Sequence, residues 1–404
     1  MTRRDDLIVG LDIGTTKVSV VVGEPSVEGV DIIGVGTHPS TGLRKGVIIN
    51  IDSTIQAIER ALEDAELMAG REITHVYAGI AGGHIKGLNS HGVVAVKDGE
   101  VKSDDIRRVI DGAQAVAIPM DREIIHVIPQ EFIVDGQDGI REPLGMSGVR
   151  LETNVHIVTA AASCAQNIIK CAKRTGLEVI EIVLDQIASA YTVLSNDEKE
   201  LGVVLADIGG GTTDLCVFLN GSVVHTAVIP VGGNLLTNDI AVGLRTPTPE
   251  AERLKLEHGS ALTSVVDKNA TIETPTVGGR KARTLSKQIL AEIIQARMEE
   301  TFTLIQRELA KTGFENLVAS GVVLTGGGAM LPYTTQLAEQ VFDLPVRVGR
   351  PEKVGGLLDL VKSPSYATSV GLVLYGKAQQ EQVPWLAKNR KVGSRVKAWL
   401  GDIF

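Results

Sequence analysis

The chain is poor in cysteine and in aromatic residues. It has three cysteines, Cys164, Cys171 and Cys216, with no C-x-x-C pair, and Phe, Trp and Tyr make up only 3% of its 404 residues. So few cysteines are typical of a reduced compartment and exclude a disulfide framework. We therefore expect the three cysteines to be small buried apolar side chains. The core must be built from Val, Ile, Leu and Ala.

Several motifs and segments are absent. No apolar run reaches the ~18 residues of a membrane span, and no apolar signal region follows the basic N-terminal residues. The only Gly-Lys pair, Gly376-Lys377, precedes Ala378, so no Walker A motif exists. No G-x-G-x-x-G follows a strand, and the eight histidines form no H-E-x-x-H. The net charge of −9 argues against a nucleic-acid partner.

Two similar segments are present instead, DIGTTK from Asp12 and DIGGGTTD from Asp207, which lie 195 residues apart. Apolar runs flank both, so each predicts a β-hairpin, and a third strand follows each hairpin. The expected strands are Leu7–Leu11, Val18–Val22 and Asp31–Thr37 in the first half, and Val203–Ala206, Leu215–Leu219 and Val223–Pro230 in the second. The pattern predicts an internal duplication.

These hairpins have the chemistry of a phosphate site. Turns of Gly and Thr present backbone N–H groups and hydroxyls to phosphate oxygens, and an Asp at each turn can hold Mg²⁺ directly or through water. One such turn alone is better explained as an ordinary hairpin, whereas two equivalent copies indicate a site. The expected ligand contacts are Asp12, Gly14, Thr15, Thr16, Lys17, Asp207, Gly209, Gly210, Gly211, Thr212 and Thr213, with Asp12 and Asp207 at the metal.

Two further glycine-rich loops are candidates. Gly326, Gly327, Gly328 and Ala329 follow the apolar strand Val322–Leu324 and open a helix expected to reach Phe342. Gly232, Gly233 and Asn234 follow the third strand of the second half. Glycine after a strand lets a ligand approach the backbone and a helix N-terminus, although a tight turn explains such a loop equally well. Beside the two hairpins, nucleotide contact is the better interpretation.

The other helices and strands are predicted from periodicity. Asp52 or Ser53 caps a helix whose apolar side runs from Ile55 to Met68, and residues 84–158 form a small α+β insertion. Asp185 is acidic and close to the second hairpin, where a kinase would need a general base, but a helix N-cap explains it as well. The remaining expected elements are His75–Ile80, Ser103–Ala115, Ala165–Thr175, Val179–Leu184, Gln186–Leu194, Leu235–Gly243, Pro249–His258, a small sheet within Gly259–Arg283, Leu285–Thr312 and Tyr366–Lys377.

The C-terminal segment 388–404, KNRKVGSRVKAWLGDIF, is basic and amphipathic. Its apolar residues fall on one helical stripe and five basic residues crowd the other side, across a polar linker at 378–387. A docked helix or a calmodulin-target-like helix is possible, but a helix lying on anionic lipid fits better. The expected membrane contacts are Lys391, Val392, Arg395, Val396, Trp399, Leu400, Ile403 and Phe404.

The three loops DIGTTK, DIGGGTTD and VLTGGGAML resemble the phosphate-one, phosphate-two and adenosine motifs of the actin, sugar-kinase and heat-shock-chaperone ATPase superfamily. This resemblance implies an α/β, actin-like, two-lobed fold with duplicated βββαβα cores of the ribonuclease H-like kind. It also implies ATP and Mg²⁺ in the cleft between the lobes. No peptide-binding domain follows, so a chaperone is not expected.

Within that superfamily the chain resembles the FtsA family of bacterial cell-division proteins. The stretches GLRKGVIINID and SKQILAEIIQARMEE, the insertion and the amphipathic tail carry this resemblance. It implies a scaffold, not an enzyme, that polymerises at the division site on the cytoplasmic face of the inner membrane and anchors the FtsZ ring there. The implied parts are 1–83 with 159–195 (subdomain 1A), 84–158 (1C, SHS2-like), 196–232 with 284–377 (2A) and 233–283 (2B).

The resemblance also implies partners. The FtsZ C-terminal peptide would meet subdomain 2B, later division proteins would meet 1C, and copies of the chain would form filaments. Hydrolysis of ATP would be slow, and no catalytic residue is identified. Two alternatives remain open from the residues, namely a pilus-assembly actin homologue and a small-molecule kinase of the same superfamily.

Overall fold

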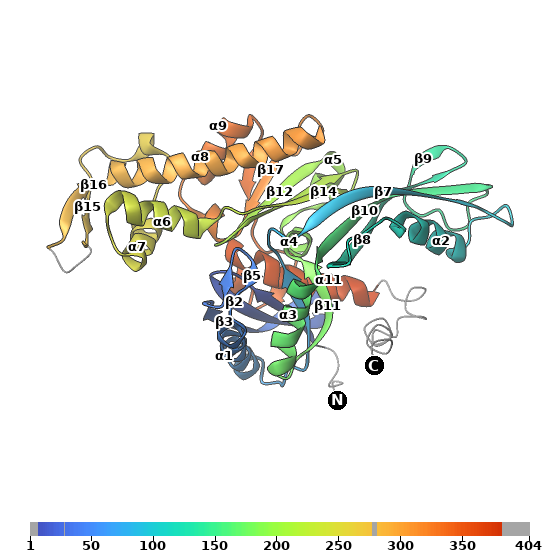
Figure 1. Cartoon of the computed structure of the whole chain (residues 1–404), viewed down its shortest axis with the longest axis horizontal. Coiled ribbons are helices and arrows are strands. Elements are labelled where there is room, and N and C mark those ends of the chain that lie inside the picture. The colour runs from blue at the N-terminus through green and yellow to red at the C-terminus, as the bar shows by residue number, and fades with distance from the viewer. Residues whose placement is uncertain (1–6, 28, 277–280, 382–404) are drawn as a thin grey trace.

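The computed structural model describes residues 7–27, 29–276 and 281–381. It has two lobes, one above the other in Figure 1, with a sheet projecting to the right and a group of helices with a small hairpin to the left. Within these residues no helix combines the length and apolar character needed to cross a membrane. The expected membrane helix at 388–404 lies outside the described residues.

The first lobe is built on a six-stranded sheet in the order β11-β6-β1-β2-β3-β19. β1, β2 and β3 form an antiparallel meander. β6 runs parallel to β1, and β11 runs parallel to β6. Both faces are covered by helices, which explains why all six residues of β1 are buried. The strands are β1 (Ile8–Ile13), β2 (Lys17–Ser26), β3 (Gly29–Pro39), β6 (His75–Ile80), β11 (Glu178–Leu184) and β19 (Gly355–Gly356).

The second lobe repeats this arrangement. Its five strands have the order β14-β13-β12-β17-β18, which matches β3-β2-β1-β6-β11 strand for strand, with the same antiparallel and parallel pairings. The strands are β12 (Val203–Ile208), β13 (Thr213–Leu219), β14 (Ser222–Ile229), β17 (Val322–Thr325) and β18 (Val346–Val348). The predicted duplication is therefore confirmed.

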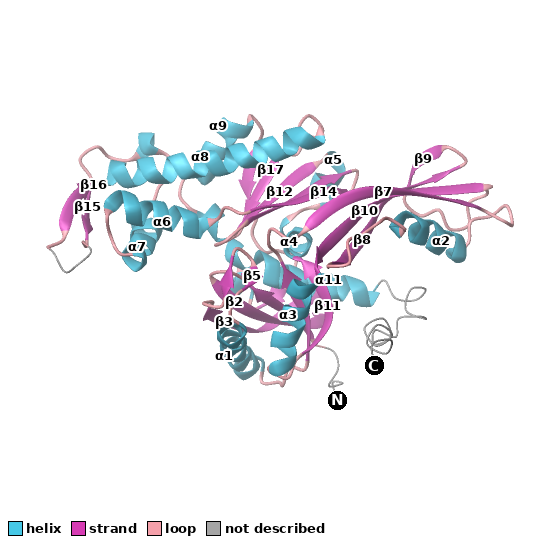
Figure 2. Cartoon of the chain, viewed as in Figure 1, coloured by secondary structure: helices cyan, strands magenta, loops and turns pink. Residues whose placement is uncertain are grey.

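Helices cover the two sheets and separate the lobes (Figure 2). α4 (Asp185–Val193) contacts β6 and β11 of the first sheet and β12 and β13 of the second, so it lies between the lobes. The other long helices are α1 (Ile51–Ala69), α3 (Ala162–Arg174), α6 (Gly233–Leu244), α7 (Thr248–His258), α8 (Lys287–Thr312), α9 (Thr334–Phe342) and α11 (Ala367–Glu381).

The insertion is a four-stranded antiparallel sheet, order β7-β10-β8-β9, with one helix against it. Its elements are β7 (Lys86–Ala95), α2 (Ser103–Gln114), β8 (Arg122–Val134), β9 (Gln137–Ile140) and β10 (Arg150–Ala161). The helix expected at Ser103–Ala115 corresponds to α2, whereas the sequence did not predict β9. That strand has mostly exposed residues, so it carries no apolar alternation.

Short elements complete the chain. They are β4 (Leu43–Arg44), β5 (Val47–Ile48), α5 (Asn196–Leu201), η1 (Thr263–Val265), β15 (Thr271–Thr274), β16 (Arg283–Ser286), η2 (Gly327–Met330), α10 (Leu358–Val361) and η3 (Pro364–Tyr366). β15 and β16 pair as the small sheet expected within Gly259–Arg283. The helix expected after Gly328 is instead divided into η2 and α9, with Pro332 between them.

Four expectations differ from the structure. α1 is capped by Asn50, whose side chain accepts from the Ser53 amide, and not by Asp52 or Ser53, and Met68 is 47% exposed rather than buried. β19, α10 and α11 pack on the sheet of the first lobe, although they fall in the range 284–377 expected for subdomain 2A. α11 continues to Glu381, so 378–381 of the expected linker is helical.

Candidate nucleotide site

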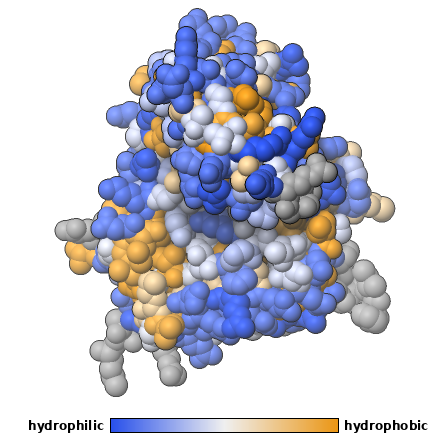
Figure 3. All heavy atoms as spheres, turned by 90° about the vertical axis from the view of Figure 1, so that its left-hand side faces the viewer, coloured by the Kyte–Doolittle hydropathy of each residue, from blue (hydrophilic) through white to orange (hydrophobic). Residues whose placement is uncertain are grey.

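A cleft of about 440 Å³ lies between the lobes. That volume is within the range of ligand pockets. The tips of the β1–β2 and β12–β13 hairpins lie in its lining. Figure 3 shows the hollow between the upper and lower lobes with polar residues around it. The cleft lining comes from β1, β2, β12, α4, α6, α7, α8, η2 and the segment around η3.

The structure brings nearly all the expected ligand contacts to this one cleft. Every predicted residue of the two hairpins, of 232–234 and of 326–329 lines it, except Thr213 and Ala329. Thr213 is buried and its hydroxyl donates to the Val231 carbonyl at 2.8 Å. Ala329 is buried in the core of the second lobe. These two residues lie beside the cleft and not in its wall.

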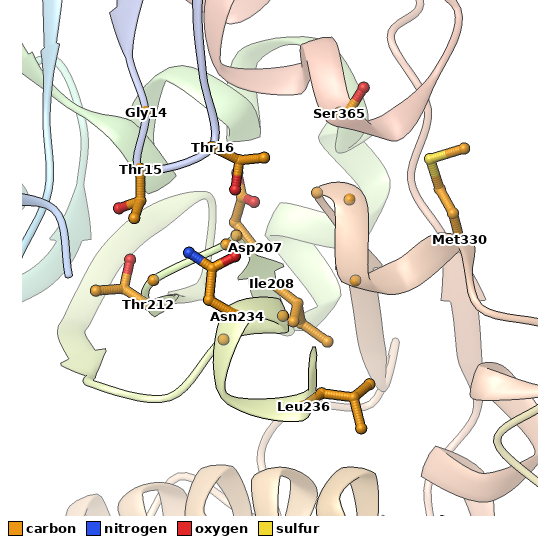
Figure 4. A pocket seen from close by; sticks show the side chains of 18 of the residues that line it. Gly14, Thr15, Thr16, Asp207, Ile208, Thr212, Asn234, Leu236, Met330 and Ser365 are labelled. Atoms are coloured by element: carbon orange, nitrogen blue, oxygen red, sulfur yellow. The ribbon is translucent and has the colours of Figure 1, made fainter. Parts of the chain in front are cut away.

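The tips of the two hairpins touch each other. The Gly14 amide donates to the Lys17 carbonyl at 3.0 Å, and the Gly209 amide to the Thr212 carbonyl at 2.9 Å, so the same closing bond is made twice. A Cβ at Gly210 would lie 1.9 Å from the Thr16 hydroxyl. Figure 4 shows Thr15 and Thr16 above Thr212 and Asn234 across the cleft. Glycine is required at the second tip because the tips approach so closely.

Four buried carboxyl groups gather around these tips. Burial raises the pKa of Asp12 to about 7, against the opposing charge of Lys17. Burial also raises the pKa of Asp214 to about 8 and raises the pKa of Asp207. Burial and the charges of the other three hold the pKa of Asp185 well above its usual range. This cluster is electrostatically unfavourable as it stands, and a bound cation would relieve it.

Asp185 is not the helix N-cap that the sequence suggested. It is the first residue of α4, the cap position is Leu184, and no side chain caps this helix. Its Oδ1 atom is buried and has no hydrogen-bond partner among the described residues, as is also true of Asp214 Oδ1. Both residues line the cleft. Sequence reasoning missed Asp214 as a cleft residue, although it ends the DIGGGTTD motif.

The carboxyl groups fit Mg²⁺ held through water. Within the described part of the chain, no three acidic, His or Cys residues come together closely enough to hold a metal ion alone. Mg²⁺ suits such a site because it keeps several waters and takes one or two carboxylates plus phosphate oxygens. Asp12 and Asp207, at the ends of equivalent strands, would hold it from the two lobes.

Lys17 contacts the segment around η3. Its Nζ lies 3.3 Å from the centroid of the Tyr366 ring and 3.5 Å from the Ser365 hydroxyl. Burial lowers the pKa of Lys17 to about 8. A cation held over an aromatic face keeps part of its stabilisation without a counter-ion. Contact with a phosphate therefore requires Lys17 to exchange this ring for the ligand.

The two other glycine loops differ in what they do. The amides of Gly233 and Asn234 donate to the carbonyls of Gly209 and Gly210 at 2.9 and 2.8 Å, so this loop supports the second hairpin from behind. Gly326 has φ of 81°, and a Cβ there would lie 2.3 Å from Asp207 Oδ1. Position 326 must therefore be glycine, because the loop passes so close to the Asp207 side chain.

The end of the cleft away from the hairpin tips was not predicted from the sequence. Leu236 and Met298 make it apolar, and Lys255 forms an ion pair with Glu252 at 2.7 Å and donates to the Thr237 hydroxyl at 2.9 Å. An apolar slot beside a paired carboxylate and ammonium suits a base and ribose. Pro249–His258 was expected as a helix, but only the tertiary fold shows that Glu252 and Lys255 turn toward the cleft.

A duplicated sheet, two facing hairpins and an interlobe cleft define an actin-like protein. Solved structures agree on the fold: the PilM–PilN type IV pilus biogenesis complex has a TM-score of 0.69 at 16% identity, covering 93% of this chain and 99% of that one. MreB5 of Spiroplasma citri bound to ADP has a TM-score of 0.56 at 16% identity, covering 94% and 99%. The MamK double helical filament has 0.53 at 14% identity, covering 94% and 99%.

The chain belongs to the FtsA family of cell division proteins. The family model for cell division protein FtsA matches residues 204–371, and the model for the SHS2 domain inserted in FtsA matches 82–159. Cell division protein FtsA of Pseudomonas aeruginosa is 54% identical over 93% of this chain and 90% of its own length. The FtsA protein of Escherichia coli K12 is 42% identical over 98% and 95%. The resemblance to this family is confirmed.

Proposed function

We propose that this chain binds ATP with Mg²⁺ in the interlobe cleft and polymerises on the cytoplasmic face of the inner membrane, where it anchors the FtsZ ring. The observation that carries the nucleotide part is the contact between the two hairpin tips, Thr16 against Gly210. Two equivalent phosphate turns closing on one cavity have no other evident use. MreB5 bound to ADP and the MamK double helical filament, which share this fold, support the same proposal.

Different residues along the cleft bind the phosphates, the metal and the base. Thr15, Thr16, Gly210 and Gly211 present hydroxyls and backbone amides to phosphate oxygens, which nests of this kind bind. Mg²⁺, when bound, neutralises phosphate charge. Asp12 and Asp207 hold its waters, and the slot at Leu236 and Met298 takes the base. Because these groups come from both lobes, the ligand favours the closed form through its higher affinity for it.

ATP is proposed to act as an assembly ligand more than as fuel, with slow hydrolysis. A scaffold role fits the family name and the fold. The other assignments remain proposals: 233–283 as subdomain 2B for the FtsZ C-terminal peptide, 84–158 as subdomain 1C for later division proteins, and 388–404 as the lipid-binding helix. One short helix binds weakly, so many tails on one polymer make attachment depend on polymerisation.

The alternatives have less support. The likeness to a pilus-assembly complex is at 16% identity and concerns the fold, whereas a cell division protein FtsA is 54% identical. A small-molecule kinase needs a second substrate next to the terminal phosphate. The cleft residues found here are accounted for by one nucleotide and its metal.

Sedimentation with vesicles tests the proposal. The full chain is mixed with anionic vesicles, ATP and Mg²⁺, and compared with the chain ending at residue 384 and with the Trp399→Glu, Leu400→Glu variant. We expect ATP-dependent pelleting and filaments for the full chain only, with nucleotide binding retained in all three. Pelleting of the variants would contradict the membrane role, and a turnover like that of a metabolic enzyme would contradict the scaffold role.

A further inference from the structure

The hairpin formed by β4 and β5 reaches the phosphate end of the cleft. Its tip is Lys45–Gly46, and Gly46 lines the cleft. The Gly46 amide donates to the Thr15 hydroxyl at 3.1 Å. A Cβ at Gly211 would lie 2.9 Å from the Cα of Lys45. The tip is therefore in contact with both phosphate hairpins, one from each lobe.

The tip is fixed in an unusual conformation. Lys45 has φ of 50°, in the left-handed region that lysine rarely adopts. Gly46 has φ of 75°, and a Cβ there would lie 2.9 Å from the Cα and amide nitrogen of Gly82. Backbone packing on one side and the Thr15 hydrogen bond on the other thus hold Lys45 in place. Backbone strain of this kind is concentrated at functional sites.

Lys45 adjoins the cleft-lining Gly46 and carries a cation that could meet added negative charge. Lys17 is occupied by Tyr366, Lys255 is paired with Glu252, and Arg297 is paired with Asp239 and Glu300. The Lys45 side chain is exposed, and within residues 7–27, 29–276 and 281–381 it makes no hydrogen bond or ion pair. The four acidic groups line the same cleft as Gly46, and they will not attract a polyphosphate.

We infer that Lys45 binds the terminal phosphate of the nucleotide and so distinguishes a triphosphate from a diphosphate, an inference that rests on the proposed nucleotide site. The nucleoside slot at Leu236 and Met298 is at the other end of the cleft, so the phosphate chain runs from there toward the hairpin tips. The terminal phosphate is therefore the one that reaches Lys45. A lysine ammonium on a flexible stem, with three donors, suits this contact.

Calorimetric titration of full-length protein with ATP and with ADP, both with Mg²⁺, tests the inference. Lys45→Met should weaken ATP binding roughly tenfold, as loss of one charged hydrogen bond predicts, and change ADP binding less than about threefold. Arg44→Met is the matched control, because it removes the same charge from the same hairpin, and it should leave both affinities unchanged. Lys45→Arg should keep most of the preference for ATP.

The outcomes separate the two proposals. If the wild-type chain binds neither nucleotide, the proposed function is wrong and this inference falls with it. If the wild type binds both and Lys45→Met keeps the wild-type ratio of ATP to ADP affinity, only the Lys45 inference is overturned. An equal loss in Arg44→Met would overturn it too, because it would show a general effect of charge. Thermal unfolding of each variant confirms that it is folded.

Discussion

The Ser189 hydroxyl donates a hydrogen bond to Oδ2 of Asp207 at 2.7 Å. Ser189 is on α4, between the two sheets, and Asp207 is near the end of β12 in the second lobe. The Thr368 hydroxyl of α11 donates to the same oxygen at 3.2 Å. One oxygen of a candidate metal ligand is thus held by helices that pack on the first lobe, which links the metal site to the lobe arrangement.

Removing this bond should destabilise the protein. Ser189→Ala leaves a buried carboxyl group with one donor fewer, and we expect a loss of about 1.5–3 kcal/mol in the free energy of unfolding. Urea denaturation measures it. Ser163→Ala, at an exposed position on α3, is the control and should change stability by less than about 0.5 kcal/mol. Equal effects would show that the Ser189 bond contributes nothing particular.

Gly326 and Gly327 should respond differently to the same substitution. Gly326→Ala places a Cβ 2.3 Å from Asp207 Oδ1 at φ of 81°, so we expect a stability loss of at least ~1 kcal/mol. A Cβ at Gly327 meets nothing within 4 Å, so Gly327→Ala should fold like the wild type. Denaturant unfolding of the two variants compares them. Wild-type stability in Gly326→Ala would contradict the close approach.

Without nucleotide or metal, the contribution of Asp12 and Asp214 to the free energy of unfolding should fall as the pH rises from 6.5 to 8. Asp12 and Asp214 have ordinary pKa values of 3.8, raised by burial to about 7 and about 8 in the folded chain. In this window the folded state holds protons that the unfolded state has lost, so ionisation opposes folding. Each group contributes up to about 1.4 kcal/mol per pH unit.

The variant Asp214→Asn isolates one of these groups. It should reduce the fall in stability between pH 6.5 and 8, while Asp138→Asn, an exposed position on β9, should keep it. Buried histidines with lowered pKa values, such as His126 at about 4, contribute a slope of opposite sign that fades above pH 6.5, and they are the same in both variants. Chemical denaturation with EDTA present is the measurement. An unchanged slope in Asp214→Asn would show that this carboxyl is not protonated in the folded state.

Asp12→Asn should remove most of the gain that Mg²⁺ gives to ATP binding. Loss of a group that orients a metal ligand typically reduces metal affinity by roughly 10–100-fold. ATP affinity measured with and without Mg²⁺ reports this gain, and affinity without Mg²⁺ should remain or rise because a buried acid is neutralised. The same Asp138→Asn variant is the control. A full Mg²⁺ gain in Asp12→Asn would place the metal elsewhere.

The local pattern of the sequence determined much of this protein. Both Asp-Ile-Gly hairpins, their third strands and the duplication follow from apolar runs broken by Gly and Thr, because a hairpin is decided by neighbouring residues. The α+β insertion also shows in local periodicity. β9 and the cap at Asn50 were missed because exposed strands and cap positions leave little apolar signal.

The tertiary structure alone decided what the cleft contains. Asp185 joins Asp12, Asp207 and Asp214 because α4 is inserted between the two sheets, and Glu252 and Lys255 face the base slot because α7 packs on α6. Helix α11 returns to the first lobe. The contacts of α4 and α11 with the two lobes join residues far apart in the sequence. The sequence determined the two hairpins, and the packing of distant elements decided which charges meet between them.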